Sequence, residues 1–430
     1  MEHTEQPQRK WHVPFFTIWT GQQLSLMGSE LAQFALVWWL TDTTDSATVL
    51  SMGMLISMLP RVVLGPFAGA LVDRWDRRVV LIVVDSVIAL ASAWLGYLFW
   101  GNLVQVWHVY LLMLVRSIGA TFHWPSMMAS TALMVPEVHL ARVSGLNQTI
   151  RGALNIISPP LGAYLLKVFP IQAIMGIDMV TAAFAIVPLF FVSIPRPKRY
   201  EAKDREGKNL LKGVWQDVGE GVRYVLSWPG LTAMLAMTAF ANLVGTPAFV
   251  LIPILVTRHF GGGVEQLGWI NSAYGVGFVL GGLALSTWGG FRRRIVTMLL
   301  GWIGMTVGTL VVGLAPTTAF WMGVAGFFIT GLFNPFGNAT TMVLLQSIVA
   351  PEVQGRVFTL VIGLSSMMAP LGMLIAGPIA DKFGVRTWYW IGGILPLIGF
   401  IGAFFVPAIM QLEEKRGEHA FVEAENGNAH

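Results

Sequence analysis

Residues 65–78, GPFAGALVDRWDRR, contain an apolar, glycine-spaced run that ends abruptly in two aspartates and three arginines. A second stretch, residues 277–294, GFVLGGLALSTWGGFRRR, has the same arrangement of an apolar run followed by arginines. Apolar helices with positively charged ends are typical of membrane-spanning segments, and their arginines mark the cytoplasmic face. The recurrence of the pattern in the second half of the chain indicates an internally duplicated membrane protein.

The composition of the 430-residue chain is that of a protein in a lipid bilayer. Hydrophobic residues make up 55% of it and charged residues only 12%, against about 25% charged residues in soluble domains. Apolar stretches of about 20 residues, the length that spans a bilayer, begin near residues 14, 48, 79, 106, 143, 171, 231, 267, 295, 318, 356 and 387. We therefore predict an all-α membrane protein with twelve transmembrane helices.

The positively charged residues predict the orientation of these helices. With the N-terminus inside, 20 of the 27 lysines and arginines fall in cytoplasmic segments, four in outer loops and three within the membrane. The positive-inside rule then places both termini in the cytoplasm. The net charge of +4 follows from this asymmetry, so we expect no nucleic-acid partner. The absence of cysteine excludes disulfides and thiol chemistry.

The chain divides into two similar halves. Pro136-Glu137-Val138 in the first half matches Pro351-Glu352-Val353 in the second, 215 residues later. Two six-helix repeats joined by a longer segment are a common plan of secondary transporters. We predict a cytoplasmic N-terminus, an N-terminal half, a cytoplasmic linker, a C-terminal half and a cytoplasmic tail at residues 1–12, 13–193, 194–230, 231–410 and 411–430.

The linker and the tail have distinct sequence patterns. Hydrophobic residues recur at helical spacing in the linker, at Leu211, Val214, Val218, Val222 and Val225. This spacing predicts an amphipathic helix on the inner membrane surface, with a plain connecting segment as the alternative. The tail is acidic and polar, which is typical of disorder.

Several short motifs resemble those of the major facilitator superfamily, and within it the drug-efflux branch that includes macrolide-efflux proteins and the enterobactin exporter. The loop between the second and third helices matches the superfamily signature at Gly69, Asp73, Arg74, Arg77 and Arg78. Arg116 to Gly119 resembles the arginine motif of the fourth helix, and residues 136–148, PEVHLARVSGLNQ, look like the efflux branch. Residues 158–163 resemble the antiporter motif of the fifth helix, with serine and alanine in place of two glycines.

The resemblance implies a fold of two pseudo-symmetric six-helix halves and a transporter, not an enzyme. It also implies a monomer in a bacterial plasma or inner membrane that rocks between two open states. We expect the loop signature to close the cytoplasmic side, with Asp85 supporting it by ion pairs to Arg77 and Arg78. Residues predicted to act in this gate or in the associated movement are Gly69, Asp73, Arg74, Arg77, Arg78, Asp85, Pro160 and Gly162.

Three ionisable residues are predicted near the middle of the membrane. An ionised group there costs on the order of 2.5–3.5 kcal/mol, so each needs a partner or a function. The resemblance places the first and fourth helices around a central cavity, which makes Glu30 and Arg116 neighbours. We expect Glu30 to exchange protons and Arg116 to tune its proton affinity; the alternative is a static ion pair. Arg61 is a second partner for Glu30 or a structural residue.

Polar residues on the helices predict a substrate site. On the first helix Gln23, Glu30 and Gln33 share a face at spacings of seven and three. The candidate substrate-binding residues are Gln23, Gln33, His123, Arg151, Asn242, Asn334 and Asn338. His123 is also a candidate proton shuttle, or satisfies the backbone freed by Pro125. Arg151 either reaches the cavity or pairs with Asp85, and we expect Asp178 to have a structural role.

The chain contains no phosphate loop, nucleotide fingerprint, metal-ligand cluster or nucleophile triad, so we expect no cofactor and no metal. The glycine pairs Gly65/Gly69 and Gly277/Gly281 predict close helix packing. We predict a proton antiporter that exports hydrophobic or amphipathic small molecules. The alternatives are an exporter of a siderophore or another anionic metabolite, bound by Arg61, Arg116 or Arg151, and a non-transporting membrane sensor or assembly module.

Overall fold

The computed structural model describes residues 11–72, 75–192, 194, 219, 222–349 and 351–413. Within these ranges the regular secondary structure is entirely helical, with no strand. The all-α prediction is therefore confirmed for this part of the chain.

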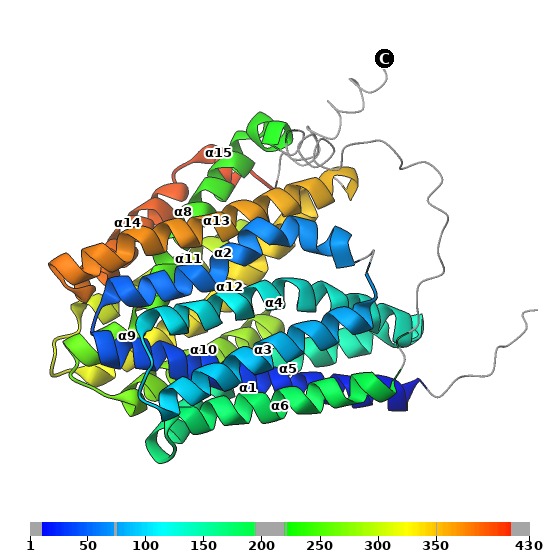
Figure 1. The fold of residues 1–430 in the computed structure, drawn as a ribbon. Helices are drawn as coiled ribbons and strands as arrows, with labels where there is room; N and C mark the ends of the chain where they lie inside the picture. The colour runs from blue at the N-terminus through cyan, green and yellow to red at the C-terminus, as the bar shows by residue number, and fades with distance from the viewer. Residues whose placement is uncertain are drawn as a thin grey trace, which may run out of the picture. The chain divides into compact units, whose positions relative to one another are not determined.

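The first half forms six long helices, which Figure 1 labels in order. They are α1 (His12–Thr44), α2 (Ala47–Val72), α3 (Arg77–Trp100), α4 (Val106–Met134), α5 (Glu137–Val168) and α6 (Ile171–Phe191).

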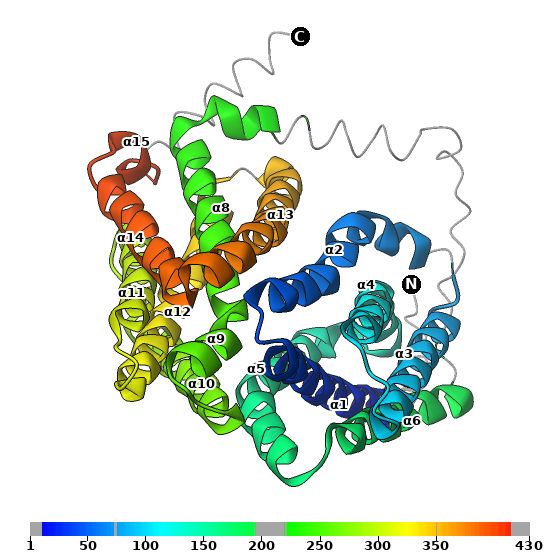
Figure 2. The same cartoon turned by 60° about the vertical axis from the view of Figure 1, so that its left-hand side comes forward.

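The second half again contains six long helices, together with shorter segments (Figure 1). The long ones are α8 (Pro229–Val250), α10 (Val264–Trp288), α11 (Arg294–Leu314), α12 (Phe320–Ile348), α13 (Pro351–Phe383) and α14 (Val385–Ala403). The short ones are α9 (Ile252–Ile254), the π-helix η1 (Leu255–His259) and α15 (Pro407–Met410). Eight helices in the described ranges are long and apolar enough to cross a membrane. The other four long helices are α1, α4, α5 and α14, which Figures 1 and 2 label. Polar side chains of α1, α4 and α5 line the cavities described below.

The contacts between Cα atoms divide the chain into two compact units. Unit 1 comprises residues 1–45, 52–201 and 263–268, and unit 2 comprises residues 46–51, 202–262 and 269–430. Each sequence half thus supplies most of one unit, while the first turn of α2 belongs to unit 2 and the first turn of α10 to unit 1. The residue bounds predicted for the five segments of the chain stay predictions.

Close helix packing in unit 1 depends on glycine. A Cβ atom on Gly21 of α1 would overlap the backbone carbonyl of Phe184 on α6, and one on Gly28 would overlap the Thr181 hydroxyl. Figure 1 shows α1 and α6 side by side. Because lipid offers no hydrophobic drive for helices to associate, small residues that let backbones approach supply much of the packing energy.

The two predicted glycine pairs behave differently. In unit 2, a Cβ atom on Gly277 or Gly281 of α10 would overlap backbone atoms of Phe328 or Leu332 on α12, as expected for close packing. For α2 the prediction is wrong: a Cβ atom on Gly65 or Gly69 has no described heavy atom within 4 Å. The glycines of α2 therefore do not fill a described helix interface.

A side chain from α13 caps the first turn of α2, within unit 2. The carboxylate of Asp381 accepts hydrogen bonds from the backbone N–H groups of Ala47 (2.9 Å) and Thr48 (2.8 Å). The Ser46 hydroxyl accepts a third, from the N–H of Val49 at 3.3 Å. The hydroxyl of Thr48 also donates to Asp381, at 2.6 Å. The donors that a helix N-terminus leaves without intrahelical partners are thus satisfied largely by a residue from the far end of the sequence.

Several predicted features lie outside the described residues. These are Asp73 and Arg74, most of the linker helix with Leu211, Val214 and Val218, and the tail beyond residue 413. Of the linker, residues 222–227 are helical, and Val225 is buried beside Trp228 and Leu231 in the core of unit 2.

Candidate functional site

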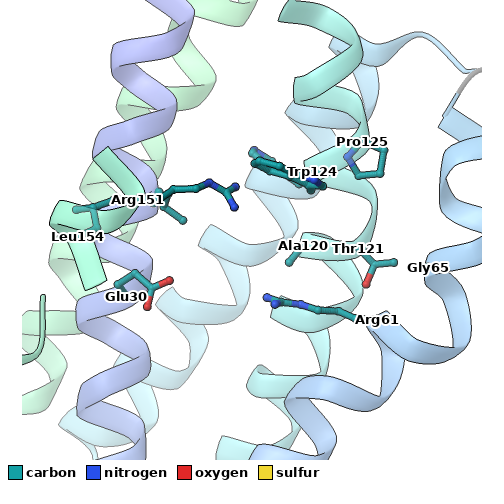
Figure 3. Close-up of a pocket in the computed structure, with 11 residues that line it drawn as sticks. Glu30, Arg61, Gly65, Ala120, Thr121, Trp124, Pro125, Arg151 and Leu154 are labelled. Atoms are coloured by element: carbon teal, nitrogen blue, oxygen red, sulfur yellow. The ribbon is translucent and has the colours of Figure 1, made fainter. Parts of the chain in front are cut away.

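Unit 1 contains a cavity of about 520 Å³ between helices α1, α2, α4 and α5. Figure 3 shows that its charged side chains come from different helices: Glu30 from α1, Arg61 from α2 and Arg151 from α5. The other lining residues are Leu26, Gly65, Ala120, Thr121, His123, Trp124, Pro125 and Leu154. The structure thus gathers three of the predicted membrane charges around one space.

Glu30 is accessible from this cavity. Its carboxylate and the guanidinium groups of Arg61 and Arg151 point into the same space (Figure 3). Within the described residues neither Glu30 nor Arg61 makes a hydrogen bond or an ion pair. Arg151 stacks on Trp124, with its Cζ atom 3.5 Å from the ring centroid, a cation–π arrangement. Of the two predicted placements of Arg151, the structure shows the cavity and not the pair with Asp85.

A second cavity of about 320 Å³ shares Leu26, Glu30, Arg61, Ala120 and His123 with the first. Gln33 lines it, as predicted, and so do Asp85 and Arg116. In it Asp85 accepts a hydrogen bond from the Gln22 amide at 2.9 Å and lies 3.4 Å from the Nε2 atom of His123. The expected contacts of Asp85 with Arg77 and Arg78 are replaced by contacts with α1 and α4.

Arg116 pairs with a different carboxylate from the one predicted. Its Nη1 atom lies 2.6 Å from Oδ2 of Asp178 on α6, and its Nη2 atom donates to the backbone carbonyl of Ser29 at 2.8 Å. Asp178 also accepts from the hydroxyls of Ser29 (3.0 Å) and Ser92 (2.7 Å). Arg116 is 9% exposed and Asp178 1%. The alternative of a static ion pair between Arg116 and Glu30 is therefore wrong, because the Arg116 guanidinium pairs with Asp178. Both residues line the second cavity, and the tuning of Glu30 by Arg116 stays a prediction.

The cavity face of α1 differs from the predicted face by one residue. Gln22, Ser25, Ser29 and Gln33 line the second cavity, whereas Gln23 lines neither cavity. The buried Oε1 atom of Gln23 has no hydrogen-bond partner among the described residues. Gln22 was missed, although its spacing of three, four and four residues to the serines and Gln33 places all four on one helical stripe.

The described gate residues contact helix ends in unit 1. Arg77 begins α3, and the carboxylate of Asp76 caps that helix by accepting from the N–H of Arg78 at 3.0 Å. The guanidinium of Arg78 donates to the backbone carbonyls of Leu189 and Phe190, where α6 ends. A cation at a helix C-terminus is stabilised by the helix dipole.

The predicted movable positions on α5 are packed against other helices of unit 1. A Cβ atom on Gly162 would lie 2.7 Å from the Phe34 ring of α1, and a Cβ atom on Gly268 would lie 3.7 Å from the Cα atom of Pro160. At the end of α5, Lys167 forms an ion pair with Glu265 in the first turn of α10.

Unit 2 contains a cavity of about 310 Å³ with a different character. It gathers all three asparagines that the sequence identified as substrate-binding candidates: Asn242, Asn334 and Asn338. Asn334 donates to the Tyr274 hydroxyl at 3.0 Å and accepts from Asn338 at 3.2 Å. The remaining lining is Ala241, Gly245, Thr246, Phe249, Trp302, Met305, Thr306, Thr309, Thr330, Gly392, Pro396 and Phe400. This cavity combines aromatic and apolar walls with three amides and five hydroxyls, and small-molecule sites likewise combine apolar walls with placed polar groups.

Within the described ranges, no group of three or more His, Asp or Glu side chains is arranged to hold a metal ion. A sequence profile described as the Major Facilitator Superfamily matches residues 18–249 and again residues 231–427. The chain belongs to the Major Facilitator Superfamily. Proteins of this superfamily are membrane transporters and not enzymes, which confirms that part of the prediction.

Named relatives of this superfamily member are efflux proteins. It is 32% identical over 406 residues to macrolide efflux protein A of Streptococcus pyogenes, covering 94% of this chain and 98% of the relative. It is 26% identical to the multidrug efflux pump Tap of Mycolicibacterium fortuitum, with 90% and 94% covered. Both similarities extend over nearly the whole length of each protein.

Solved structures share the superfamily fold with this chain. A D-xylose–proton symporter matches with a TM-score of 0.65 at 14% identity, covering 92% of this chain and 98% of the symporter. A bacterial homologue of the human lysosomal transporter Spinster matches with a TM-score of 0.63 at 14% identity, with 96% and 99% covered. At these identities the likeness concerns the fold alone.

Proposed function

We propose that this chain is a proton-coupled exporter of hydrophobic or amphipathic small molecules. The observation that carries the proposal is Glu30, a carboxylate in a cavity of about 520 Å³ that has no hydrogen bond or ion pair within the described residues. The macrolide and multidrug efflux proteins among its relatives support the substrate class.

Glu30 is suited to carry the coupling proton because it can gain or lose a proton without breaking a described bond. When ionised, it is stabilised by the positive charge of Arg116 and by that of Arg61 and Arg151 across the cavity (Figure 3). A rearrangement of α2 or α5 that withdraws these guanidinium groups favours the neutral acid, and their return favours release of the proton. The exchange thereby follows the conformational cycle.

The unit 2 cavity is suited to hold the substrate. Its aromatic walls, including Phe249, Trp302 and Phe400, offer apolar contact, and Asn334 and Tyr274 offer hydrogen bonds. An uncharged lining of this kind accepts many amphipathic molecules, because few polar anchors need to be satisfied.

We propose that the substrate crosses by rocking of two halves around a central site, as in other transporters with repeats. The predicted latch on the cytoplasmic side includes Asp73, Arg74, Arg77 and Arg78, with Gly69 in the preceding helix. An Asp73→Asn variant is expected to slow the cycle and spare substrate binding. We further propose a monomer in a bacterial plasma membrane with both termini in the cytoplasm.

The test is transport by the purified chain in lipid vesicles. Radiolabelled macrolides, a siderophore and lysolipids are each assayed for flux with and without an imposed pH gradient. Flux of a macrolide that rises with the gradient supports the proposal. Flux of no compound under either condition contradicts it and restores the idea of a sensor or assembly module.

A second candidate is an exporter of anionic metabolites. The observation that favours it is Arg61, which lines the cavity with no ion pair among the described residues, close to a second guanidinium, that of Arg151. Two guanidinium groups facing one carboxylate leave a positive charge that an anionic substrate could neutralise. Loss of siderophore flux in an Arg151→Ala variant, with macrolide flux absent from the unmodified protein, identifies this alternative.

A further inference from the structure

Three polar side chains from three helices meet at one end of the second unit 1 cavity: Gln22 of α1, Asp85 of α3 and His123 of α4. The Gln22 amide nitrogen donates to Oδ2 of Asp85 at 2.9 Å. The Nε2 atom of His123 lies 2.7 Å from the Gln22 carbonyl oxygen and 3.4 Å from Oδ1 of Asp85. Each member of this Gln22–Asp85–His123 cluster therefore contacts the other two.

The cluster fixes which nitrogen of the histidine carries hydrogen. When Asp85 is ionised, the amide nitrogen of Gln22 must face it, because the reversed amide would set an oxygen against a carboxylate oxygen. The Gln22 oxygen then faces Nε2 of His123, so Nε2 must be the N–H donor. Nδ1 makes no hydrogen bond within the described residues and is the atom at which the ring can take up a second proton.

The charged side chains around the cluster leave Asp85 without an arginine or lysine in contact among the described residues. The other charged side chains that line these two cavities or bond to a lining residue come from each neighbouring helix: Glu30, Arg61, Arg116, Arg151 and Asp178. Arg116 is bonded to Asp178, and Arg61 and Arg151 point into the space that Glu30 faces (Figure 3). Asp85 is 5% exposed, and among the described residues its side chain hydrogen-bonds or pairs with Gln22 and His123 alone.

A buried carboxylate without a cationic partner is strongly unfavourable, because it loses hydration that one amide cannot replace. Two arrangements remove this cost. Either His123 is protonated and forms an ion pair with Asp85, or Asp85 itself carries the proton beside a neutral ring. Both arrangements contain the same atoms and one proton more than the ionised carboxylate with a neutral imidazole.

We propose that Asp85 and His123 together bind one transported proton, at a site separate from Glu30. This inference rests on the proposed proton coupling and adds a second proton site to it. The proton binds at Nδ1 of His123 or at a carboxylate oxygen of Asp85, and it leaves as a proton to cavity water, with no other bond changed. The His123 side chain is 26% exposed and lines both cavities, which gives the site its access.

Gln22 is a positioning residue in this site. It contacts both titratable groups, and its carbonyl oxygen holds Nε2 of the imidazole beside the carboxylate, 3.4 Å from Oδ1 of Asp85. A movement of α1 against α3 and α4 breaks both contacts together, so proton release at this site is tied to the movement of the helix that carries Glu30.

The test is a nitrogen NMR measurement on the full chain, labelled with ¹⁵N-histidine, in lipid nanodiscs without any substrate. The His123 signals are assigned by their loss in a His123→Asn variant, with His259→Asn in unit 2 as the matched control. If His123 carries the shared proton, we expect its signals to show Nε2–H and a substantial imidazolium fraction at neutral pH. In Asp85→Asn the imidazolium-to-imidazole ratio at the same pH falls roughly tenfold or more, because an opposite charge in contact is lost.

Infrared spectra of the same samples cover the alternative position of the proton. A protonated carboxyl band that disappears in Asp85→Asn, with a neutral His123, also supports the shared proton. The proposal is overturned if neither the imidazolium nor this band is present at any pH between 5 and 8. If His123 is the protonated group, an imidazolium fraction that is unchanged in Asp85→Asn overturns it as well.

These spectra need no transport activity, so they separate this inference from the proposed function. If vesicles show no proton-driven flux but the spectra show the bound proton, the coupling proposal fails; Asp85 and His123 then share a proton that is not transported. If flux depends on the pH gradient but the spectra show no such proton, Glu30 remains and the second site is excluded. In folded variants, flux that is equally proton-driven in Asp85→Asn also excludes a transported proton at this pair.

Discussion

The cavities of the two units are similar in size and opposite in chemistry. The smaller unit 1 cavity, of about 320 Å³, is lined by Glu30, Asp85, His123 and two arginines, whereas the unit 2 cavity, of about 310 Å³, has no carboxylate, histidine, lysine or arginine among its lining residues. Both units of this duplicated chain thus contain a cavity of this size, and the titratable side chains that line it are concentrated in unit 1. We infer that unit 1 handles protons and unit 2 handles the substrate.

The charges of unit 1 also differ among themselves. Arg116 and Asp178 are buried, bonded to each other and to hydroxyl and carbonyl groups, while Glu30 and Arg61 face open space. The first pair has the surroundings of a structural ion pair, and the second group has the accessibility that proton exchange requires. Four predictions test these distinctions.

The largest effect is expected when the buried pair of unit 1 is broken. An Arg116→Ala variant leaves Asp178 as a buried charge without its cation, which destabilises by roughly 3–5 kcal/mol. The apparent unfolding temperature in detergent, followed by tryptophan fluorescence, should fall clearly. In the matched double variant Arg116→Met with Asp178→Leu, most of the loss should be recovered. An unchanged unfolding temperature in the single variant would show that the pair is not structural.

The second prediction concerns the proton side of the comparison. Glu30→Gln keeps the size of the side chain and removes the group that binds and releases a proton. Gradient-driven efflux of a macrolide should therefore fall roughly 5- to 150-fold, the factor that typical coupling free energies produce. Substrate binding without a gradient should persist. The control is Glu265→Gln, a carboxylate paired with Lys167 outside the cavity. Efflux that is still fully driven by the pH gradient in Glu30→Gln would show that the coupling proton binds at another residue.

The third prediction compares the duplicated glycine pairs. Gly281→Ala forces a methyl group into the Leu332 backbone and should cost about 1–3 kcal/mol by overpacking. Gly69→Ala meets no described atom within 4 Å and should have little effect or stabilise α2 slightly, since alanine favours helix. Unfolding temperatures of the two variants measure the difference. Equal losses would mean that Gly69 is as tightly packed as Gly281.

The smallest effect is expected in the unit 2 cavity. Asn334→Ala removes a bond to Asn338 within α12 and a bond to Tyr274 of α10. Interhelical bonds such as the one to Tyr274 contribute about 0.6–1.7 kcal/mol. Macrolide affinity should weaken about 3- to 18-fold by the same range, with its pH dependence unchanged. Equilibrium binding at two pH values provides the measurement. A changed pH dependence would contradict the assignment of proton exchange to unit 1 and of substrate binding to unit 2.

Much of the fold was predictable because its signals are local. Apolar runs of spanning length and the repeated glycine-arginine pattern are read along one segment at a time. The grouping of Asn242, Asn334 and Asn338 in one cavity could also be predicted, because amide side chains on apolar helices face the interior of the helix bundle and not the lipid. The positions of Glu30, Arg61 and Arg151 on one cavity follow from the same argument.

The pairing of side chains was less predictable, because it depends on how helices rotate and which ones adjoin. Asp178 forms the ion pair with Arg116 because α6 lies against α1 and α3, an arrangement that the pattern of a single helix does not reveal. A spacing of seven from Glu30 indicates Gln23, yet Glu30 lies at the edge of the cavity face, whose centre contains Gln22. One residue rotates a helix position by about 100°, enough to move a side chain out of the cavity.

The cap on the first turn of α2 has a consequence for the order of folding during synthesis. Thr48 and the residue that caps it, Asp381, are 333 residues apart in the chain. At about 5–20 residues per second, the ribosome needs roughly 17 to 67 seconds between them. Throughout this interval the N–H groups of α2 that later donate to Asp381 must instead donate to water or to lipid headgroups. We expect the beginning of this early helix to be among the last parts of the molecule to reach its final structure.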